Sequence, residues 1–219
     1  MNDPIAAARP VDGMAGKRLL YTILAAGIAL RIFHYVDNRS LWEDEVFLAS
    51  SLIHMDFIEL LTKPLDYMQR APVGFLMLER LVVVLWNGKE MALRLVPLLS
   101  GIIALVLFVR VRRFFLKSGT ALLVTVALFA FSPPLVYHSV EAKQYGTELL
   151  ATVLSLRLHI WFHRANRLPQ LLAWGAAGAI ILWFSFSSLF VLFGIAGAVC
   201  MTDMYRKDWK MFFWHLLPF

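Results

Sequence analysis

The sequence contains a single cysteine, Cys200, among its 219 residues. One cysteine cannot close a disulfide within the chain, and it cannot supply a cysteine cluster for a metal. Charged residues are scarce, at 16% of the chain, whereas they make up about a quarter of a soluble domain. The sequence also lacks a glycine-rich phosphate loop, and His54 and His138 have no metal-ligand spacing between them. These absences argue against a disulfide-bonded module, a metal site and a P-loop protein.

Apolar residues are abundant instead. Hydrophobic residues make up 60% of the chain, and the mean hydropathy is +0.68. They cluster in long blocks of membrane-spanning length. The net charge of +6 comes from short basic bursts between these blocks, not from a basic face interleaved with aromatic residues, so no nucleic-acid partner is expected. The composition therefore predicts an all-α protein, a polytopic bundle of transmembrane helices.

About six membrane spans are expected, and the opening of a seventh. They are about 19–35, 91–109, 119–136, 146–162, two short helices within 171–201 that turn at Ser185, Ser187 and Ser188, and 211–219. Lys17 and Arg18 precede the first span, which is longer than a signal-peptide core, so it is expected to be an uncleaved anchor. Residues 1–18 are then a cytoplasmic N-terminus and 19–219 one transmembrane domain.

The stretch from Asp37 to Glu90 carries nine acidic and five basic residues, a net charge of −4. Within it, residues 72–86 are apolar but short, with Glu79 and Arg80 at their middle. Charges at mid-bilayer cost about 2.5–3.5 kcal/mol each, so an amphipathic helix at the interface is expected instead. All four basic bursts face the cytoplasm only if residues 72–86 do not cross the bilayer. The bursts are Lys17 with Arg18, 110–117, 163–167 and 206–210. A large first external loop, about 37–90, follows.

The first candidate site is the segment Trp42-Glu43-Asp44-Glu45, which opens the expected external loop. Adjacent carboxylates raise one another's pKa, and this suits a group that must accept a proton. The alternative is a solvated acidic helix start, where carboxylates favour the positive end of the helix dipole. The residues alone leave both interpretations open.

The second candidate segment runs from Ser132 to Glu148. Its prolines are expected to end one helix, and the next is expected to begin near Val140. On that helix Glu141, Tyr145 and Glu148 would share one face. Glu148 would then lie about a turn inside the membrane, either as a functional acid or paired with a neighbouring helix through an arginine.

Two arginines lie near the expected outer ends of spans. Arg31 is expected to extend its charged end to the interface. Arg94 opens the second span, where it would either hold a phosphate or pair with a loop carboxylate. Arg157 and His159, toward the cytoplasmic end of their helix, are expected to be structural.

Three sequence features occur in one order and on one expected side of the membrane. They are Asp44-Glu45 early in the external loop; an apolar helix beginning near Pro72 and ending in Trp86-Asn87-Gly88, with Arg94 beyond; and Ser132-Pro133 followed by Glu141-Ala142-Lys143 and Tyr145. In these features the chain resembles the GT-C superfamily of membrane glycosyltransferases, in the branch of protein O-mannosyltransferases and aminoarabinose transferases. The resemblance covers the N-terminal half of a typical member, so a C-terminally truncated chain is expected.

The resemblance implies transfer of a sugar from a polyprenyl-phosphate carrier to an acceptor on the outer face, in a bacterial inner membrane. Asp44 would be the general base of an inverting reaction, and Glu45 would support it. The departing lipid phosphate would be held by cations. The candidates are Arg94, Lys143 and Arg70. Glu141 and Tyr145 would contact the sugar or the acceptor, and no cofactor or metal is expected.

The main alternative is a non-catalytic membrane protein: a transporter half, a lipid-carrier scaffold or an inactive relative. A transporter would place polar residues at mid-bilayer and show inverted repeats. The sequence shows no such repeat, and its polar residues gather at one expected face.

Overall fold

The computed structural model describes residues 13–86, 89–163, 165 and 167–216, and the regular structure of these residues is helical, without a β-strand. The expected all-α fold is therefore confirmed. Most of the expected cytoplasmic N-terminus, Asn87 and Gly88 of the aromatic-x-Gly element, and the last three residues of the expected seventh span lie outside the described residues.

Three helical segments are long and apolar enough to cross a membrane: Met14–Asp37 (α1), Glu90–Phe115 (α5 and α6) and Ser188–Tyr205 (α11). Two apolar helices are shorter, Gly119–Phe131 (α7) and Leu168–Phe184 (α10). The helices between α1 and α6 are α2 (Glu43–His54), α3 (Glu59–Thr62), the 3-10 turn η1 (Asp66–Met68), α4 (Val73–Leu85) and α5 (Glu90–Leu93), with α6 at Leu95–Phe115. The others are α8 (Pro133–Tyr137), α9 (Tyr145–Phe162) and α12 (Trp209–Leu216).

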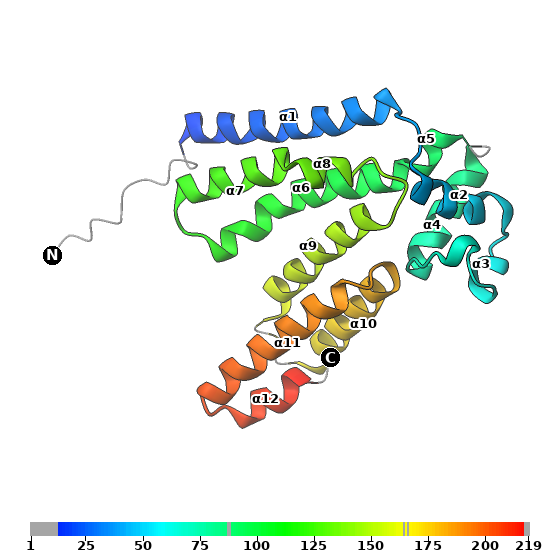
Figure 1. Ribbon diagram of the computed structural model, residues 1–219. Helices are drawn as coiled ribbons and strands as arrows, with labels where there is room; N and C mark the ends of the chain where they lie inside the picture. Colours follow the sequence, from blue (N-terminus) through cyan, green and yellow to red (C-terminus); the bar gives the residue numbers. More distant parts are fainter. Residues whose placement is uncertain (1–12, 87–88, 164, 166, 217–219) are drawn as a thin grey trace.

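The long helices form two neighbouring groups (Figure 1). Helix α1 packs on α6 and α7, and α9 packs on α6, α10 and α11. Helices α2 to α5 gather at the end of the bundle where α1 finishes and α6 and α9 begin. The connection between α6 and α7 and the end of α11 lie away from them. The acidic stretch thus lies at one end of the helices. Three basic bursts lie at other ends, namely Lys17 with Arg18, 110–117 and 206–210.

Helix α1 is held to the bundle along a narrow stripe. Its buried residues are Gly16, Leu20, Gly27 and Arg31. A Cβ at Gly27 would lie 2.8 Å from the Cβ of Ala130, so the glycine permits the close approach of α1 to α7. Most of the remaining α1 surface is apolar and exposed, including Tyr21, Phe33 and Val36. An exposed apolar surface of this extent is typical of a helix that meets lipid or another protein.

The expected turn between two short helices at the serines is confirmed. Helix α10 ends at Phe184 and α11 begins at Ser188. The Ser185 hydroxyl accepts a hydrogen bond from the Ser188 backbone N–H at 3.1 Å, and the Ser188 hydroxyl donates to the Ser185 carbonyl at 2.8 Å. These bonds satisfy backbone groups that the helix ends leave open.

Helix α4 coincides with the apolar segment expected at 72–86, and it is packed on both sides. It contacts α2, α3, α5, α6 and α10. Arg80 donates to the carbonyls of Leu52 and Ile53 at 2.9 and 3.1 Å. Glu79 is fully buried, and neither carboxyl oxygen has a hydrogen-bond partner among the described residues. Burial raises the pKa of Glu79 well above its ordinary value, which favours the neutral acid.

Candidate functional site

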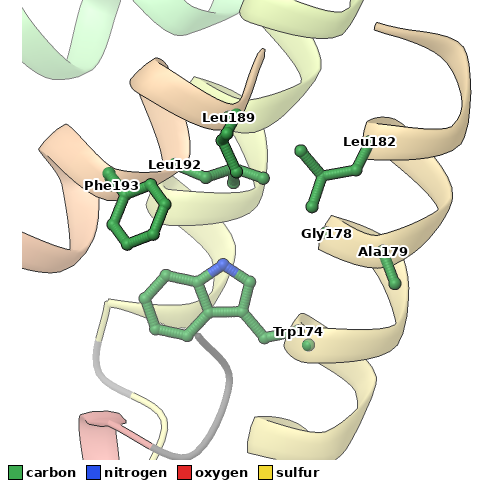
Figure 2. A pocket seen from close by; sticks show the side chains of 8 residues that line it. Trp174, Gly178, Ala179, Leu182, Leu189, Leu192 and Phe193 are labelled. Atoms are coloured by element: carbon green, nitrogen blue, oxygen red, sulfur yellow. The ribbon is translucent and has the colours of Figure 1, made fainter. Parts of the chain in front are cut away.

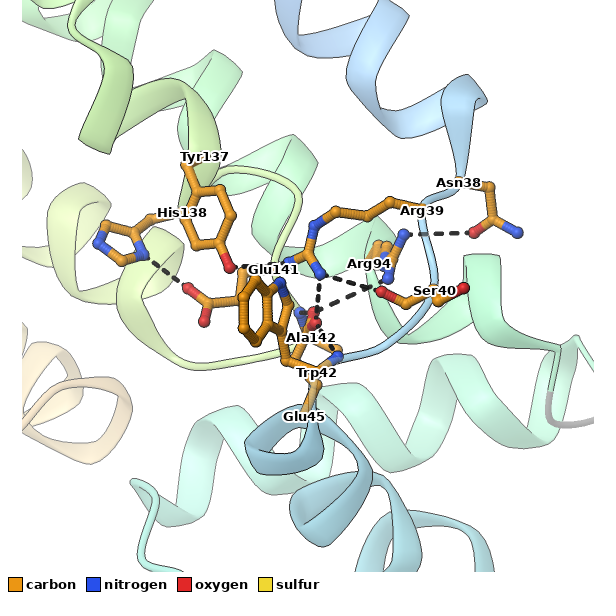
Figure 3. Close-up of polar contacts among 10 residues, drawn as sticks. All are labelled: Asn38, Arg39, Ser40, Trp42, Glu45, Arg94, Tyr137, His138, Glu141 and Ala142. Carbon is orange, nitrogen blue, oxygen red and sulfur yellow. Dashed lines mark hydrogen bonds and ion pairs between the residues drawn. The ribbon is translucent and has the colours of Figure 1, made fainter.

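The loop after α1 and the segment before α9 meet at the end of the bundle beside α2 (Figure 3). The Ala142 backbone N–H donates to the Glu45 carboxylate at 2.7 Å. The Arg39 guanidinium donates to the Tyr137 hydroxyl at 3.2 Å and lies over the Tyr137 ring. The structure thus joins the two segments that the sequence marked as candidate sites.

The expected helix start near Val140 is wrong. Residues 138–144 form turns, and α9 begins at Tyr145, so Glu141 does not share a helix face with Tyr145 and Glu148. Backbone groups of these turns are bound by other parts of the chain, as the Ala142–Glu45 bond shows. The prolines also begin a helix rather than only ending one, because Pro133 starts α8.

Arg31 fixes the start of these turns, and it does not reach the interface as expected. It is fully buried and donates to the carbonyls of Gly27 and Ala130, both at 2.9 Å. It also donates to the Phe129 carbonyl at 3.3 Å and to the Ser139 hydroxyl at 3.2 Å. The reason is the break of α7 at Ser132, which leaves the carbonyls of its last turn without helical partners.

Glu45 is the centre of the buried contacts. Its Oε2 accepts from the Trp42 backbone N–H at 2.9 Å, as in a capping box, and lies 2.9 Å from an Arg39 nitrogen. Its Oε1 accepts from Ala142 and lies 3.9 Å from an Arg94 nitrogen. Since Glu45 is fully buried, it orders the site and does not contact a substrate in this arrangement.

Arg94 takes the second of its two expected roles, because it faces the loop carboxylate of Glu45. It is fully buried, and its NH1 donates to the Asn38 side-chain oxygen at 3.4 Å. Its Nε and NH2 have no hydrogen-bond partner among the described residues. A lipid phosphate has no access to a guanidinium that is fully buried.

Asp44 points away from Glu45, so the neighbouring carboxylates occupy different environments. Its side chain is 66% exposed, yet one oxygen lies 3.2 Å from the Lys143 ammonium. Gln69 donates to the other oxygen at 3.3 Å and accepts from Lys143 at 2.7 Å. Lys143 itself is only 4% exposed. A closed triangle of contacts therefore joins Asp44, Gln69 and Lys143, which come from three distant segments. The Asp44 carboxylate of this triangle is accessible to solvent.

The segment that carries Gln69 is held in an unusual backbone conformation. Tyr67 and Met68 have φ angles of 51° and 56°, which non-glycine residues seldom adopt. The Tyr67 ring stacks on Phe47 of α2 with 4.4 Å between centroids. The Asp66 backbone N–H donates to the Ser51 hydroxyl at 2.8 Å. Such strain persists where surrounding contacts fix it, and it is common at functional sites.

A second polar group lies beside the triangle. His138 Nδ1 and a Glu141 oxygen are 2.6 Å apart, and the Tyr145 ring packs on His138 with 4.8 Å between centroids. Tyr145 is 39% exposed. Arg70 is also exposed, and no described residue pairs with its side chain; its carbonyl accepts from Gln144 at 3.5 Å.

Sequence reasoning missed Gln69 and the pairing of His138. Nothing in the pattern around Gln69 marks it, because its contact partners are remote in sequence. His138 and Glu141 are three residues apart, and this spacing permits contact within a turn. Glu148 faces the Ser187 hydroxyl of the serine turn and not an arginine.

An apolar pocket of about 190 Å³ lies between α10 and α11 (Figure 2). Its lining includes Trp174, Gly178 and Leu182 from α10, and Leu192 and Phe193 from α11. Its lining carries no acidic or basic side chain, so it suits a mainly apolar group. Among the described residues, no set of three or more histidines, cysteines or acids could hold a metal ion.

No protein-family model, curated protein or solved structure matches the chain. The support for a function therefore comes from the contacts described above.

Proposed function

We propose that the chain belongs to a membrane glycosyltransferase that moves a sugar from a polyprenyl-phosphate carrier to an acceptor at the outer face. The observation that carries this proposal is the accessible Asp44 carboxylate, held by Lys143 and Gln69. An exposed base beside a cation satisfies two needs of sugar transfer from a lipid phosphate, proton acceptance and charge stabilisation.

A multi-pass arrangement in a bacterial inner membrane is part of the proposal. It is supported by the long apolar helices and by the exposed apolar surface of α1. Residues 37–90 form the external loop, with α2 to α4 beyond the ends of the spans (Figure 1). The basic bursts at the other helix ends then face the cytoplasm.

The proposed reaction assigns separate roles to Asp44 and Lys143. The acceptor hydroxyl oxygen bonds to the anomeric carbon while the bond from that carbon to the phosphate oxygen breaks. Asp44 takes the hydroxyl proton, and the polyprenyl phosphate leaves with the bonding electrons. Attack opposite the leaving phosphate inverts the anomeric carbon. Lys143, which pairs with Asp44 without substrate, turns to the phosphate when the donor binds, and this frees the carboxylate.

The neighbouring residues extend this proposal to substrate contacts. Arg70, whose exposed guanidinium pairs with no described residue, is the second phosphate ligand. Arg94 acts through Glu45 and not on the phosphate, because it is buried. Glu141, which contacts His138, faces the sugar or the acceptor. The exposed ring of Tyr145, which packs on His138, does the same.

The test is a transfer assay with a labelled polyprenyl-phosphate sugar and membranes containing the protein. Asp44→Asn should lower the rate by about 10²- to 10⁴-fold, the usual contribution of a general base. Glu43→Gln removes a neighbouring carboxylate and is the matched control. Equal rates in the parent and Asp44→Asn, or no transfer by the parent protein, would count against the assignment and favour a non-catalytic membrane protein.

A further inference from the structure

A second polar cavity lies away from the candidate site, where α9 and α11 end and α12 packs on α11. Its volume is about 230 Å³. Ala198 and Val199 form its apolar part, and its polar lining comes from three helices and from the residues that follow α9 and α11. The polar residues are His159, His163, Thr202, Asp203, Arg206 and His215. None of them has a role in the proposed transfer reaction.

His215 and Asp203 form a buried hydrogen-bonded pair. His215 Nδ1 lies 2.6 Å from an Asp203 oxygen, and Nε2 lies 3.2 Å from the Ala165 carbonyl oxygen. Both ring nitrogens of His215 and one Asp203 oxygen therefore have partners inside the chain. Both residues are buried.

Arg206 is the charged group that the cavity presents to a ligand. It is exposed, and no described residue pairs with its guanidinium. The carboxyl group of Asp203, in contrast, is buried and hydrogen-bonded to His215. The exposed guanidinium therefore favours an anion.

The two remaining imidazoles offer further hydrogen bonds. His159 Nδ1 is buried and has no partner among the described residues, although buried polar atoms are usually bonded. His163 Nδ1 lies 2.9 Å from the Ile160 carbonyl oxygen, so it carries a hydrogen and leaves Nε2 for a ligand. The His159 and His163 rings are 5.7 Å apart, and the Phe114 ring packs edge-on against both.

We propose that this cavity binds a phosphate group, with Arg206 as its charged ligand and His159 and His163 as hydrogen-bonding partners. Arginine recognises phosphate through parallel N–H donors. Two sources share this chemistry: inorganic phosphate, and the headgroup of an anionic phospholipid in the leaflet that the basic bursts face. The proposal uses residues remote from Asp44 and does not depend on glycosyl transfer.

The test compares Arg206→Gln with Lys210→Gln, which removes an equal charge from exposed α12 outside the cavity. Calorimetry with inorganic phosphate is done on the purified chain in detergent. Phospholipid retention is measured by native mass spectrometry from nanodiscs of phosphatidylcholine with and without phosphatidylglycerol. Arg206→Gln should weaken phosphate binding or phosphatidylglycerol retention by about tenfold or more, as loss of a charge-assisted bond does.

The two measurements also separate the sources. Phosphate binding without selective lipid retention identifies a free anion, and selective retention of phosphatidylglycerol identifies a headgroup. Arg206→Lys, which keeps the charge, should restore part of the binding. Equal binding by Arg206→Gln and Lys210→Gln, or no binding of either probe by the parent protein, overturns the proposal.

Discussion

The Lys143 ammonium lies 3.2 Å from the Asp44 carboxylate and connects the first turn of α2 to the segment before α9. The two side chains differ greatly in access, since Asp44 is 66% exposed and Lys143 is 4% exposed. A molecule in solvent can therefore reach the carboxylate directly, whereas it reaches the ammonium only by displacing Asp44 or Gln69. This difference in access supports the separate roles proposed for the two residues.

Lys143→Gln should weaken the binding of a polyprenyl phosphate by about 1.5–3 kcal/mol, because one charge-assisted bond is lost. Binding is measured by calorimetry with the short-chain lipid phosphate in detergent. Lys89→Gln, an exposed charge change outside the triangle, is the control. Equal affinities of the two variants would remove Lys143 from the phosphate site.

The sequence predicted helix positions well where a segment is long and apolar. The expected spans 19–35 and 91–109 lie within α1 and within α5 and α6, which are long and apolar enough to cross a membrane. The serine turn lies where it was expected. The expected span 146–162 coincides in position with α9, which is not among the helices of spanning length and hydropathy. These features depend on local composition and on serines that can satisfy open backbone groups. The direction of a side chain between packed helices has no comparable local signal.

The burial of Arg31, Arg94 and Glu45 could not be predicted, although pairing of Arg94 with a loop carboxylate was one of two expectations. Each is charged and fully buried, and each is held by partners distant in sequence. A charge can be buried only where the fold supplies such partners, and one sequence does not reveal them. The sequence marked Asp44 and Lys143 separately, but their contact required the turns at 138–144, of which residues 140–144 were expected to be helical.

Glu79→Gln should make the stability of the protein less dependent on pH. The pKa of Glu79 is raised in the folded state, so its contribution is fully present below the unfolded pKa of about 4.3 and is lost as pH rises toward the folded value. The variant should therefore match the parent at about pH 4 and exceed its thermal midpoint at about pH 8. Glu59→Gln, at an exposed acid, is the control. A parallel pH profile for Glu79→Gln and the parent would show that Glu79 is ionised in the fold.

The external placement of residues 37–90 predicts that α4 does not cross the bilayer. Cysteines introduced at Asp66 and Lys89, on either side of α4, should both react with an impermeant thiol reagent applied from outside. The background for both variants is Cys200→Ala, which removes the one natural thiol. A cysteine at Lys210 should react only after the membrane is opened. Reaction at Lys89 from the cytoplasmic side alone would show that α4 spans the membrane.

Asp44 and Glu45 are adjacent, and the structure predicts opposite effects of changing them. Asp44→Asn keeps the size of an exposed side chain and leaves the bond from Lys143 to Gln69, so the thermal midpoint should fall less than in Glu45→Gln while sugar transfer falls. Glu45→Gln puts an amide NH₂ among donors, because backbone N–H groups and two arginines surround this carboxylate. Removing one partner of a buried charge pair costs about 3–5 kcal/mol, so the thermal midpoint of Glu45→Gln should fall clearly.

The two variants are compared by thermal unfolding in detergent and by transfer rate at a temperature where both are folded. A rate deficit without a stability deficit in Asp44→Asn identifies a group that takes part in the reaction. A stability deficit in Glu45→Gln identifies a group that holds α2 to the turns at 138–144. If Asp44→Asn unfolds as readily as Glu45→Gln, its bond to Lys143 is a structural tie. Asp44 would then not be the general base, because the lower transfer rate of Asp44→Asn would come from unfolding and not from the loss of proton transfer.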